Sequence, residues 1–191
     1  MPRSTDTRQR MLRTTARLLR RHGYSATGWR QVVAESNTPW GSQAHHFPGG
    51  KEQLAAEAVT LAGAHYERLL RAGLADTHPA KFVEQWATLA AAELESSGWS
   101  DGCPVATVAL ETAHTSERLA GACAGVLSGW HGALTDAIVA RRIALREAES
   151  LATLILASIE GALLLARAKR DAEPLRTVGS ELAALLRGRV P

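Results

Sequence analysis

Apolar side chains recur at intervals of three and four residues along almost the whole chain, and this spacing constrains the fold more than any other feature. Stretches that alternate apolar and polar residues between turn residues are nearly absent, so strands are not expected. The apolar content rests mainly on Ala and Leu, which are good helix formers, and only 5% of the residues are aromatic. The sequence therefore predicts an all-α fold.

Capping and turn residues divide this pattern into nine expected helices. Gly23 follows the first helix as a stop, Thr27 is a candidate N-cap of the second, and Thr38-Pro39 is typical of an N-cap followed by the first helical residue of the third. Pro48-Gly49-Gly50 then ends that short helix. The expected helices cover residues 7–22, from 27 to the turn at 36–38, 39–47, 51–74, 79–98, 104–113, from 116, 146–170 and from 174.

Composition excludes several other classes of protein. The opening MPRSTDTRQR is polar and basic and no apolar segment follows it, so a signal peptide is not expected. The most apolar stretch, 151–168, contains Glu160, whose carboxylate would be costly inside a bilayer, so this stretch is predicted to be a buried helix. Cys103 and Cys123 form no disulfide framework. We expect a cytoplasmic protein without membrane contact, cofactor or metal.

Charge is divided unevenly along the chain. Residues 1–51 hold nine basic and two acidic side chains, a net charge of +7, whereas the remainder holds 13 basic and 17 acidic side chains, a net charge of −4. A basic end on an acidic remainder is typical of a protein that presents that end to a polyanion. The alternative is a solvated helix face that is rich in arginine.

The first three expected helices are short, and a tight turn joins the second to the third, as in a helix-turn-helix. In that motif a short helix enters the major groove of DNA and its exposed residues contact base edges, while flanking helix ends contact phosphates. The candidate DNA contacts are Thr27, Arg30, Thr38, Trp40, Gly41, Ser42, Ala44, His45, His46 and Lys51.

Residues 7–54 resemble the DNA-binding domain of TetR-type transcriptional regulators. The features that match are Gly23-Tyr24, Thr27, His46-Phe47, Lys51-Glu52 and Leu54. The segment HHFPGGKEQL and the later Gly102-Cys103-Pro104-Val105 are similar to the LmrA/YxaF-like branch of that family. The resemblance implies a DNA-binding domain over 5–65, a ligand-binding and dimerisation domain over 66–191, and a homodimer that a small-molecule effector releases from a palindromic double-stranded DNA operator.

The chain departs from the family pattern at three places in the helix-turn-helix. Gln43-Ala44 stands where the family usually has Leu-Tyr, Trp40 where this branch commonly has Lys, and Asn37 where the turn usually has Gly. The missing Tyr removes a common DNA contact, and Gln43 brings an amide to a position that is normally packed inside.

The later helices are expected to enclose a ligand pocket, because a pocket needs apolar walls and a few polar groups. Trp86 and Trp130 are predicted to line it, and Gly121, Gly125 and Gly129 to leave space along one helix beside Trp130. The candidate ligand-binding residues are His65, Tyr66, Trp86, Trp99, Glu111, His114 and Trp130. The alternative is that the aromatic residues are plain core.

The expected helix at 146–170 is apolar almost all round, which is typical of a helix that is buried on more than one face. With the amphipathic helix that follows Pro174, it is predicted to form a two-fold, four-helix interface between two chains over residues 146–188. Leu163 and Leu182 are the residues chosen to test that interface.

Enzymatic and metal-binding functions have little support in the sequence. Cys103, His114 and Cys123 match no metal-ligand spacing, and neither a phosphate-binding loop nor a nucleophile elbow is present. The sequence predicts a DNA-binding transcriptional regulator, a repressor that a small apolar or aromatic ligand releases. The alternative is a helical ligand-binding or interaction protein that has lost DNA binding, for which Gln43-Ala44 is the motivating feature.

Overall fold

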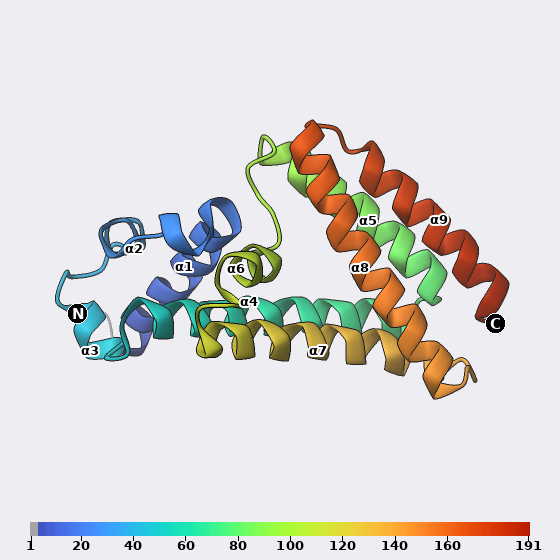
Figure 1. Ribbon diagram of the computed structural model, residues 1–191, viewed down its shortest axis with the longest axis horizontal. Coiled ribbons are helices and arrows are strands. Elements are labelled where there is room, and N and C mark those ends of the chain that lie inside the picture. Colours follow the sequence, from blue (N-terminus) through green and yellow to red (C-terminus); the bar gives the residue numbers. More distant parts are fainter. Residues whose placement is uncertain (1–3) are drawn as a thin grey trace. The chain divides into compact units, whose positions relative to one another are not determined.

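The computed structural model describes residues 4–191, and within this range it contains nine helices and no strand (Figure 1). The helices are α1 (Ser4–Ala26), α2 (Trp29–Ser36), α3 (Ser42–His46), α4 (Gly50–Ala75), α5 (Pro79–Ser96), α6 (Pro104–Thr112), α7 (Glu117–Val139), α8 (Leu145–Lys169) and α9 (Glu173–Arg189). The prediction of an all-α fold is confirmed.

The chain forms two compact units. The first contains residues up to His65 together with Cys103–Leu127, and the second contains Tyr66–Gly102 together with Ser128–Pro191. Helices α4 and α7 each contribute residues to both units. The first unit thus holds α1, α2, α3 and α6, and the second holds α5, α8 and α9.

The core of the first unit follows the apolar stripe of α1. The buried positions Met11, Leu12, Thr15, Leu18 and Leu19 recur at spacings of three and four residues, so they lie on one side of the helix. The helical spacing of the sequence predicts these five residues on the inner side together with Ala16, which is half-buried. Buried side chains of other elements complete this core, namely Val32, Phe47, Leu54, Ala58, Val59, Val105, Val108 and Leu119.

Two helix starts differ from the sequence-based expectation. The N-cap of α2 is Gly28 rather than Thr27, because the Thr27 hydroxyl instead donates to the Gly23 carbonyl at 2.7 Å. Helix α3 begins at Ser42, three residues later than expected, because a turn in which the Ser42 N–H donates to the Pro39 carbonyl precedes it. In both cases a turn precedes the helix, and a hydrogen bond within that turn uses the group that was expected to cap or begin the helix.

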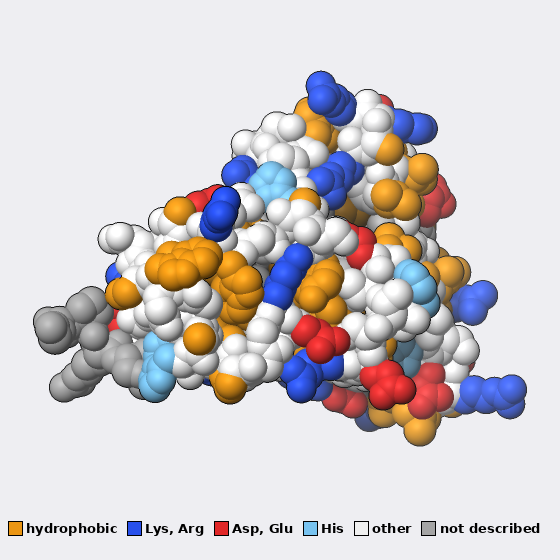
Figure 2. Space-filling view, turned by 60° about the vertical axis from the view of Figure 1, so that its left-hand side comes forward, with side chains coloured by type: hydrophobic (Ala, Val, Ile, Leu, Met, Phe, Trp, Pro, Cys, Tyr) orange, Lys and Arg blue, Asp and Glu red, His pale blue; other side chains and the backbone are white. Residues whose placement is uncertain are grey.

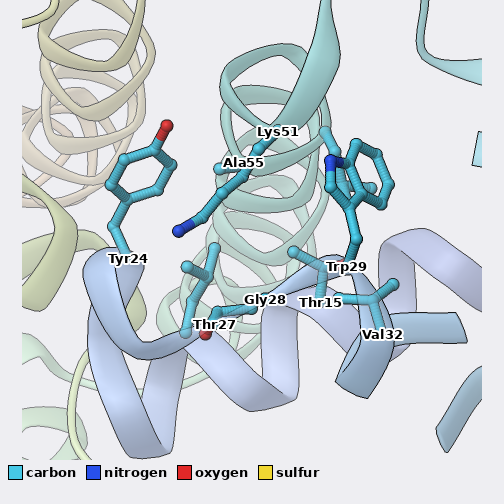
Figure 3. A pocket seen from close by; sticks show the side chains of 10 residues that line it. Thr15, Tyr24, Thr27, Gly28, Trp29, Val32, Lys51 and Ala55 are labelled. Carbon is cyan, nitrogen blue, oxygen red and sulfur yellow. The ribbon is translucent and has the colours of Figure 1, made fainter. Parts of the chain in front are cut away.

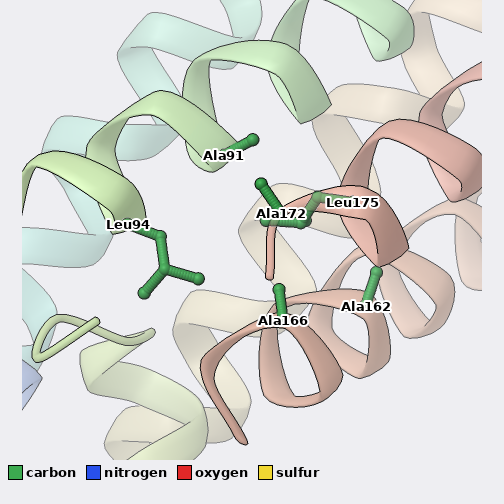
Figure 4. Close-up of a cluster of buried hydrophobic side chains, with 6 residues drawn as sticks. All are labelled: Ala91, Leu94, Ala162, Ala166, Ala172 and Leu175. Atoms are coloured by element: carbon green, nitrogen blue, oxygen red, sulfur yellow. The ribbon is translucent and has the colours of Figure 1, made fainter. Parts of the chain in front are cut away.

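The second unit is held together by small residues that let helices approach closely. A Cβ at Gly179 of α9 would lie 2.5 Å from the Ala87 Cβ of α5, and one at Gly73 would lie 2.3 Å from the Phe82 ring. Beside them, buried side chains of α5 and α8 join those of α9 and the residue that precedes it (Figure 4), namely Ala91, Leu94, Ala162, Ala166, Ala172 and Leu175. Because most of these residues are alanines, the backbones pack closely.

Helix α8 exposes an apolar stripe within the single chain. Leu154, Leu164 and Leu165 are 44%, 62% and 51% exposed, and Ala157 and Gly161 are exposed between them. The expectation that α8 is buried on more than one face is therefore not met by one chain alone.

Among the described residues, α8 is also the one helix that is long and apolar enough to cross a membrane. Core helices of soluble proteins meet the same criteria of length and composition.

Candidate nucleic-acid interface

Helices α2 and α3 are joined by a hydrogen-bonded connection of five residues. Asn37 takes the left-handed conformation (φ 50°, ψ 52°), and its N–H reaches back to the last turn of α2. The hydroxyls of Ser36 and Thr38 pair at 2.8 Å inside this connection. Phe47, which follows α3, is buried and lies 6.3 Å from the Trp29 ring of α2 between ring centroids. These contacts hold α3 against α2 as a helix-turn-helix.

Most predicted DNA contacts lie on the outer side of this motif. Trp40 is 56% exposed in the turn before α3. Gly41, Ala44 and His45 are also exposed, and so is Arg30 in the first turn of α2. Ser42 and His46 are half-buried. The chain thus brings an indole, a hydroxyl and two imidazoles together on one short helix and its preceding turn.

Thr27 and Thr38, two of the predicted DNA contacts, are buried and do not face outward. They are only 2% and 8% exposed. The Thr27 hydroxyl bonds the Gly23 carbonyl, and that of Thr38 pairs with Ser36. Both threonines therefore shape the turns that flank α2. The sequence gives no local signal that separates this role from that of an exposed phosphate contact.

Lys51, another predicted DNA contact, binds residues of the first unit itself. Its Nζ donates to the Ser25 carbonyl at 3.2 Å and lies 4.3 Å from the centroid of the Tyr24 ring. Burial lowers the pKa of Lys51 below its ordinary value, while the charge of Glu111 raises it. Figure 3 shows the lysine reaching from α4 beside Tyr24, at a cavity of about 10 Å³. That volume suits one water molecule and is too small for an effector.

Many of the N-terminal arginines are paired with acidic groups. Arg8 bonds Glu57, and Arg17 bonds Glu35 at 2.8 Å. Figure 2 shows, on the one face it presents, basic side chains dispersed among hydrophobic, acidic and uncharged ones. Among the residues that the structure describes, none forms an ion pair with Arg30. Glu35 is already counted in the net charge of +7 for residues 1–51, whereas Glu57 lies outside that range, so its pairing with Arg8 removes one further cation from those available to a polyanion.

His46 differs from His45 in its surroundings. It packs beside Phe47, with ring centroids 6.4 Å apart. Burial lowers the pKa of His46, and the positive charges of His45 and Arg8 lower it further. His46 thus stays neutral to a lower pH than an ordinary histidine, so near pH 7 its side chain is a neutral imidazole.

Gln43 carries a buried oxygen that lacks a partner. No described group donates a hydrogen bond to its Oε1. We expect Gln43→Leu to raise the free energy of unfolding by about 1 kcal/mol, because the substitution removes an unsatisfied buried acceptor. Urea unfolding checks this, with Gln9→Leu on the exposed side of α1 as the matched control. An unchanged or lowered stability of Gln43→Leu would contradict the interpretation.

The predicted ligand-binding residues are only partly brought together. The Tyr66 ring of α4 lies edge-on to Trp130 of α7, with centroids 5.9 Å apart, and Trp130 is only 4% exposed. Trp86 packs near Phe82 on α5, and Trp99 packs against the buried cluster drawn in Figure 4. Of the predicted ligand-binding residues, Tyr66 and Trp130 thus contact each other through their rings in the second unit.

Three of the predicted ligand residues belong to the first unit. His65 and His114 are exposed, and Glu111 accepts hydrogen bonds from the backbone N–H groups of Tyr24 and Ser25. Both oxygens of Glu111 thus bind backbone amides of the first unit, so its hydrogen bonds serve the Tyr24-Ser25 turn. This pairing spans more than 80 residues, so no local sequence pattern reveals it.

The glycines of α7 also differ from the expectation. Nothing lies within 4 Å of a Cβ built at Gly121 or Gly125, and both are exposed. A Cβ at Gly129 would instead lie 2.7 Å from a Glu67 carboxylate oxygen. The first two glycines therefore face outward in the single chain, and the third admits a side chain of α4.

A short exposed helix held against α2 on a buried frame defines the class of helix-turn-helix DNA-binding proteins. Residues 11–58 match the model for bacterial regulatory proteins of the tetR family, and residues 79–181 match that for the C-terminal domain of LmrA/YxaF-like transcriptional regulators. The chain belongs to the TetR family of transcriptional regulators, in its LmrA/YxaF-like branch. The predicted family is confirmed.

Relatives and solved structures agree with this assignment. The chain is 35% identical over 183 residues to the HTH-type transcriptional regulator YxaF of Bacillus subtilis, covering 95% of this chain and 96% of that protein. It is 32% identical over 187 residues to LmrA of the same organism, covering 95% and 97%. A TetR transcriptional regulator from Chloroflexus aurantiacus superposes with a TM-score of 0.81 at 27% identity, covering 100% of this chain and 98% of that one. Regulatory protein TetR from Rhodobacter sphaeroides shares the fold, with a TM-score of 0.82 at 21% identity over 92% and 96%.

Proposed function

We propose that the protein is a cytoplasmic repressor that binds a palindromic DNA operator as a homodimer and leaves it when a small apolar or aromatic ligand binds the second unit. The observation that carries the DNA-binding part is the surface of α3 and its preceding turn. Trp40, Ala44 and His45 are exposed there, while Trp29 and Phe47 hold the helix from behind. Exposed side chains on a fixed short helix suit direct contact with base edges in the major groove.

The exposed apolar stripe of α8 supports the dimer. Leu154, Ala157, Gly161 and Leu164 are spaced by three and four residues, so they share one side of the helix. A second copy that packs on this stripe by a two-fold axis would bury the same residues twice. Leu163 and Leu182, which the sequence offered as test positions, are unsuitable because they already pack within their own chain. Two symmetric copies would present their α3 helices to two half-sites one helical turn of DNA apart.

Arg30 is the basic residue best placed to contact a phosphate. We expect Arg30→Ala to weaken binding to all duplexes about equally and to reduce the salt slope of the binding constant by about one unit, because a phosphate contact reads no sequence. Titrations at several salt concentrations measure both quantities. Lys81→Ala, on the exposed side of α5, is the control. A changed sequence preference in Arg30→Ala would give Arg30 a role in base recognition instead.

The contact between Tyr66 and Trp130 is where we place the effector. Aromatic walls suit a ligand with an apolar body. The aromatic dye 1-anilinonaphthalene-8-sulfonate serves as a probe, and Trp130→Ala is expected to weaken its binding about tenfold while DNA affinity changes less than about threefold. Trp130→Phe, which disturbs packing less, is measured beside it. Equal losses of dye and DNA binding in both variants would make Trp130 a plain core residue.

A ligand-binding protein with weakened DNA affinity is the second candidate function. It is favoured by Gln43, whose buried oxygen lacks a partner among the described residues, and by the small side chain of Ala44. Absence of DNA binding at low salt, where phosphate contacts are strongest, would favour this candidate over the first.

A further inference from the structure

The backbone of α1 is interrupted at Gly23, and this leaves two N–H groups that α1 does not satisfy. Gly23 has φ 79° and ψ −176°, a conformation outside the helical region. The residues after such a break resemble the first turn of a new helix, whose N–H groups need partners from elsewhere. Here those groups belong to Tyr24 and Ser25, three to four residues before the N-cap of α2 at Gly28.

A single carboxylate from α6 satisfies both groups. Oε1 of Glu111 accepts a hydrogen bond from the Tyr24 N–H at 3.1 Å, and Oε2 accepts one from the Ser25 N–H at 2.8 Å. Hydrogen bonds to an ionised acceptor are stronger than neutral ones, and two parallel bonds also fix orientation. A Cβ at Gly23 would lie 1.8 Å from Oε1 of Glu111, so the carboxylate reaches the backbone only because residue 23 is glycine.

The same turn is held from its other side by α4. Lys51 donates to the Ser25 carbonyl at 3.2 Å and lies over the Tyr24 ring. The next residue, Glu52, accepts a hydrogen bond from the Ser116 hydroxyl, which precedes α7. The Tyr24-Ser25 turn is thus held by the Glu111 carboxylate on its N–H groups and by the Lys51 ammonium on the Ser25 carbonyl. These contacts determine where the chain enters α2.

We infer that Glu111 is a positioning residue for DNA binding. It holds the Tyr24-Ser25 turn, which sets how α2 and therefore α3 leave α1, and it does so from α6. Loss of the carboxylate frees the turn without altering any side chain on α3. This inference rests on the proposed function, because its consequence for DNA requires that α3 bind DNA.

Three variants of the full chain test this role. Glu111→Ala removes both acceptors, Glu111→Gln retains one amide oxygen that can accept one of the two bonds, and Glu117→Ala removes an exposed carboxylate as the matched control. The measurements are affinity for a duplex from the chain's own upstream region, hydrogen exchange of the Tyr24 and Ser25 amides in free protein, and thermal unfolding.

We expect Glu111→Ala to lose exchange protection at both amides and to bind the duplex about tenfold more weakly. Glu111→Gln keeps one of the two bonds, so it is expected to lose less affinity and less exchange protection than Glu111→Ala. Glu117→Ala is expected to match the unmodified chain. Unfolding temperatures that fall equally in Glu111→Ala and Glu111→Gln, with affinity following them, would make the residue merely structural and overturn the inference. So would full affinity in Glu111→Ala despite lost protection. If the unmodified chain binds no duplex, the proposed function fails. Exchange protection of the Tyr24 and Ser25 amides that stays unchanged in Glu111→Ala would separately overturn the role of Glu111.

Discussion

Leu164→Arg is expected to sediment as a monomer at concentrations where the unmodified chain is a dimer. Leu164 is 62% exposed in the single chain and lies in the apolar stripe of α8, so a dimer that uses this stripe buries it twice. An arginine there places two unpaired charges in an apolar interface, which is costly unless they find partners. The dissociation constant of the dimer should rise by about a hundredfold or more. DNA affinity should fall with it, because one protomer reads one half-site.

The control for this prediction is Leu110→Arg. Leu110 is 78% exposed on α6 and lies outside the stripe, so the same substitution should leave the dimer intact. Sedimentation velocity on both variants and the unmodified chain gives the comparison. A dimer that persists in Leu164→Arg, or an unmodified chain that is monomeric, would move the interface away from α8.

Gly23→Ala is expected to destabilise the first unit by about 3 kcal/mol. The backbone at residue 23 has φ 79° and ψ −176°, a conformation that residues other than glycine rarely adopt. A Cβ would also lie 1.8 Å from a Glu111 oxygen and 3.3 Å from a Thr107 methyl group. Strain and displacement of the carboxylate act together, so DNA affinity should fall more than about tenfold.

Gly28→Ala is the matched control for Gly23→Ala. Gly28 caps α2 with φ −108°, and nothing lies within 4 Å of a Cβ built there. Its replacement by alanine should therefore change stability by much less than the change at residue 23. Chemical unfolding measures both variants, and similar losses at the two positions would show that the conformation of Gly23 is not the cause.

The helices and the core of the first unit could be predicted from the sequence, because both depend on the local spacing of apolar residues. The stripe of α1 at Met11, Leu12, Leu18 and Leu19 needs only the helical period to be identified, and these residues are buried. In α4 the same period predicts one apolar stripe of Leu54, Ala58, Leu61, His65 and Leu69. Leu54 and Ala58 are buried, whereas Leu69 is 53% exposed. A long helix meets different neighbours along its length, so one stripe does not describe all of it.

The site was less predictable because its hydrogen bonds join distant parts of the chain. Exposed Trp40 and His45 follow from their places in the turn before α3 and on the short helix itself. Glu111 and Lys51, by contrast, meet at the Tyr24-Ser25 turn from α6 and α4, which no spacing pattern encodes. Side chains with several possible partners, such as Thr27, are assigned only when the fold shows which partner is near.

Titration of a labelled duplex from the chain's own upstream region, beside a scrambled duplex of equal length, tests the central claim most directly. We predict binding of two protomers per duplex, with the upstream duplex bound at least about a thousandfold more tightly than the scrambled one near physiological salt. Both affinities should fall as salt rises, because counterions are released from phosphates. Equal affinity for the two duplexes, or no binding at about 50 mM salt, would contradict sequence-specific DNA binding by α3.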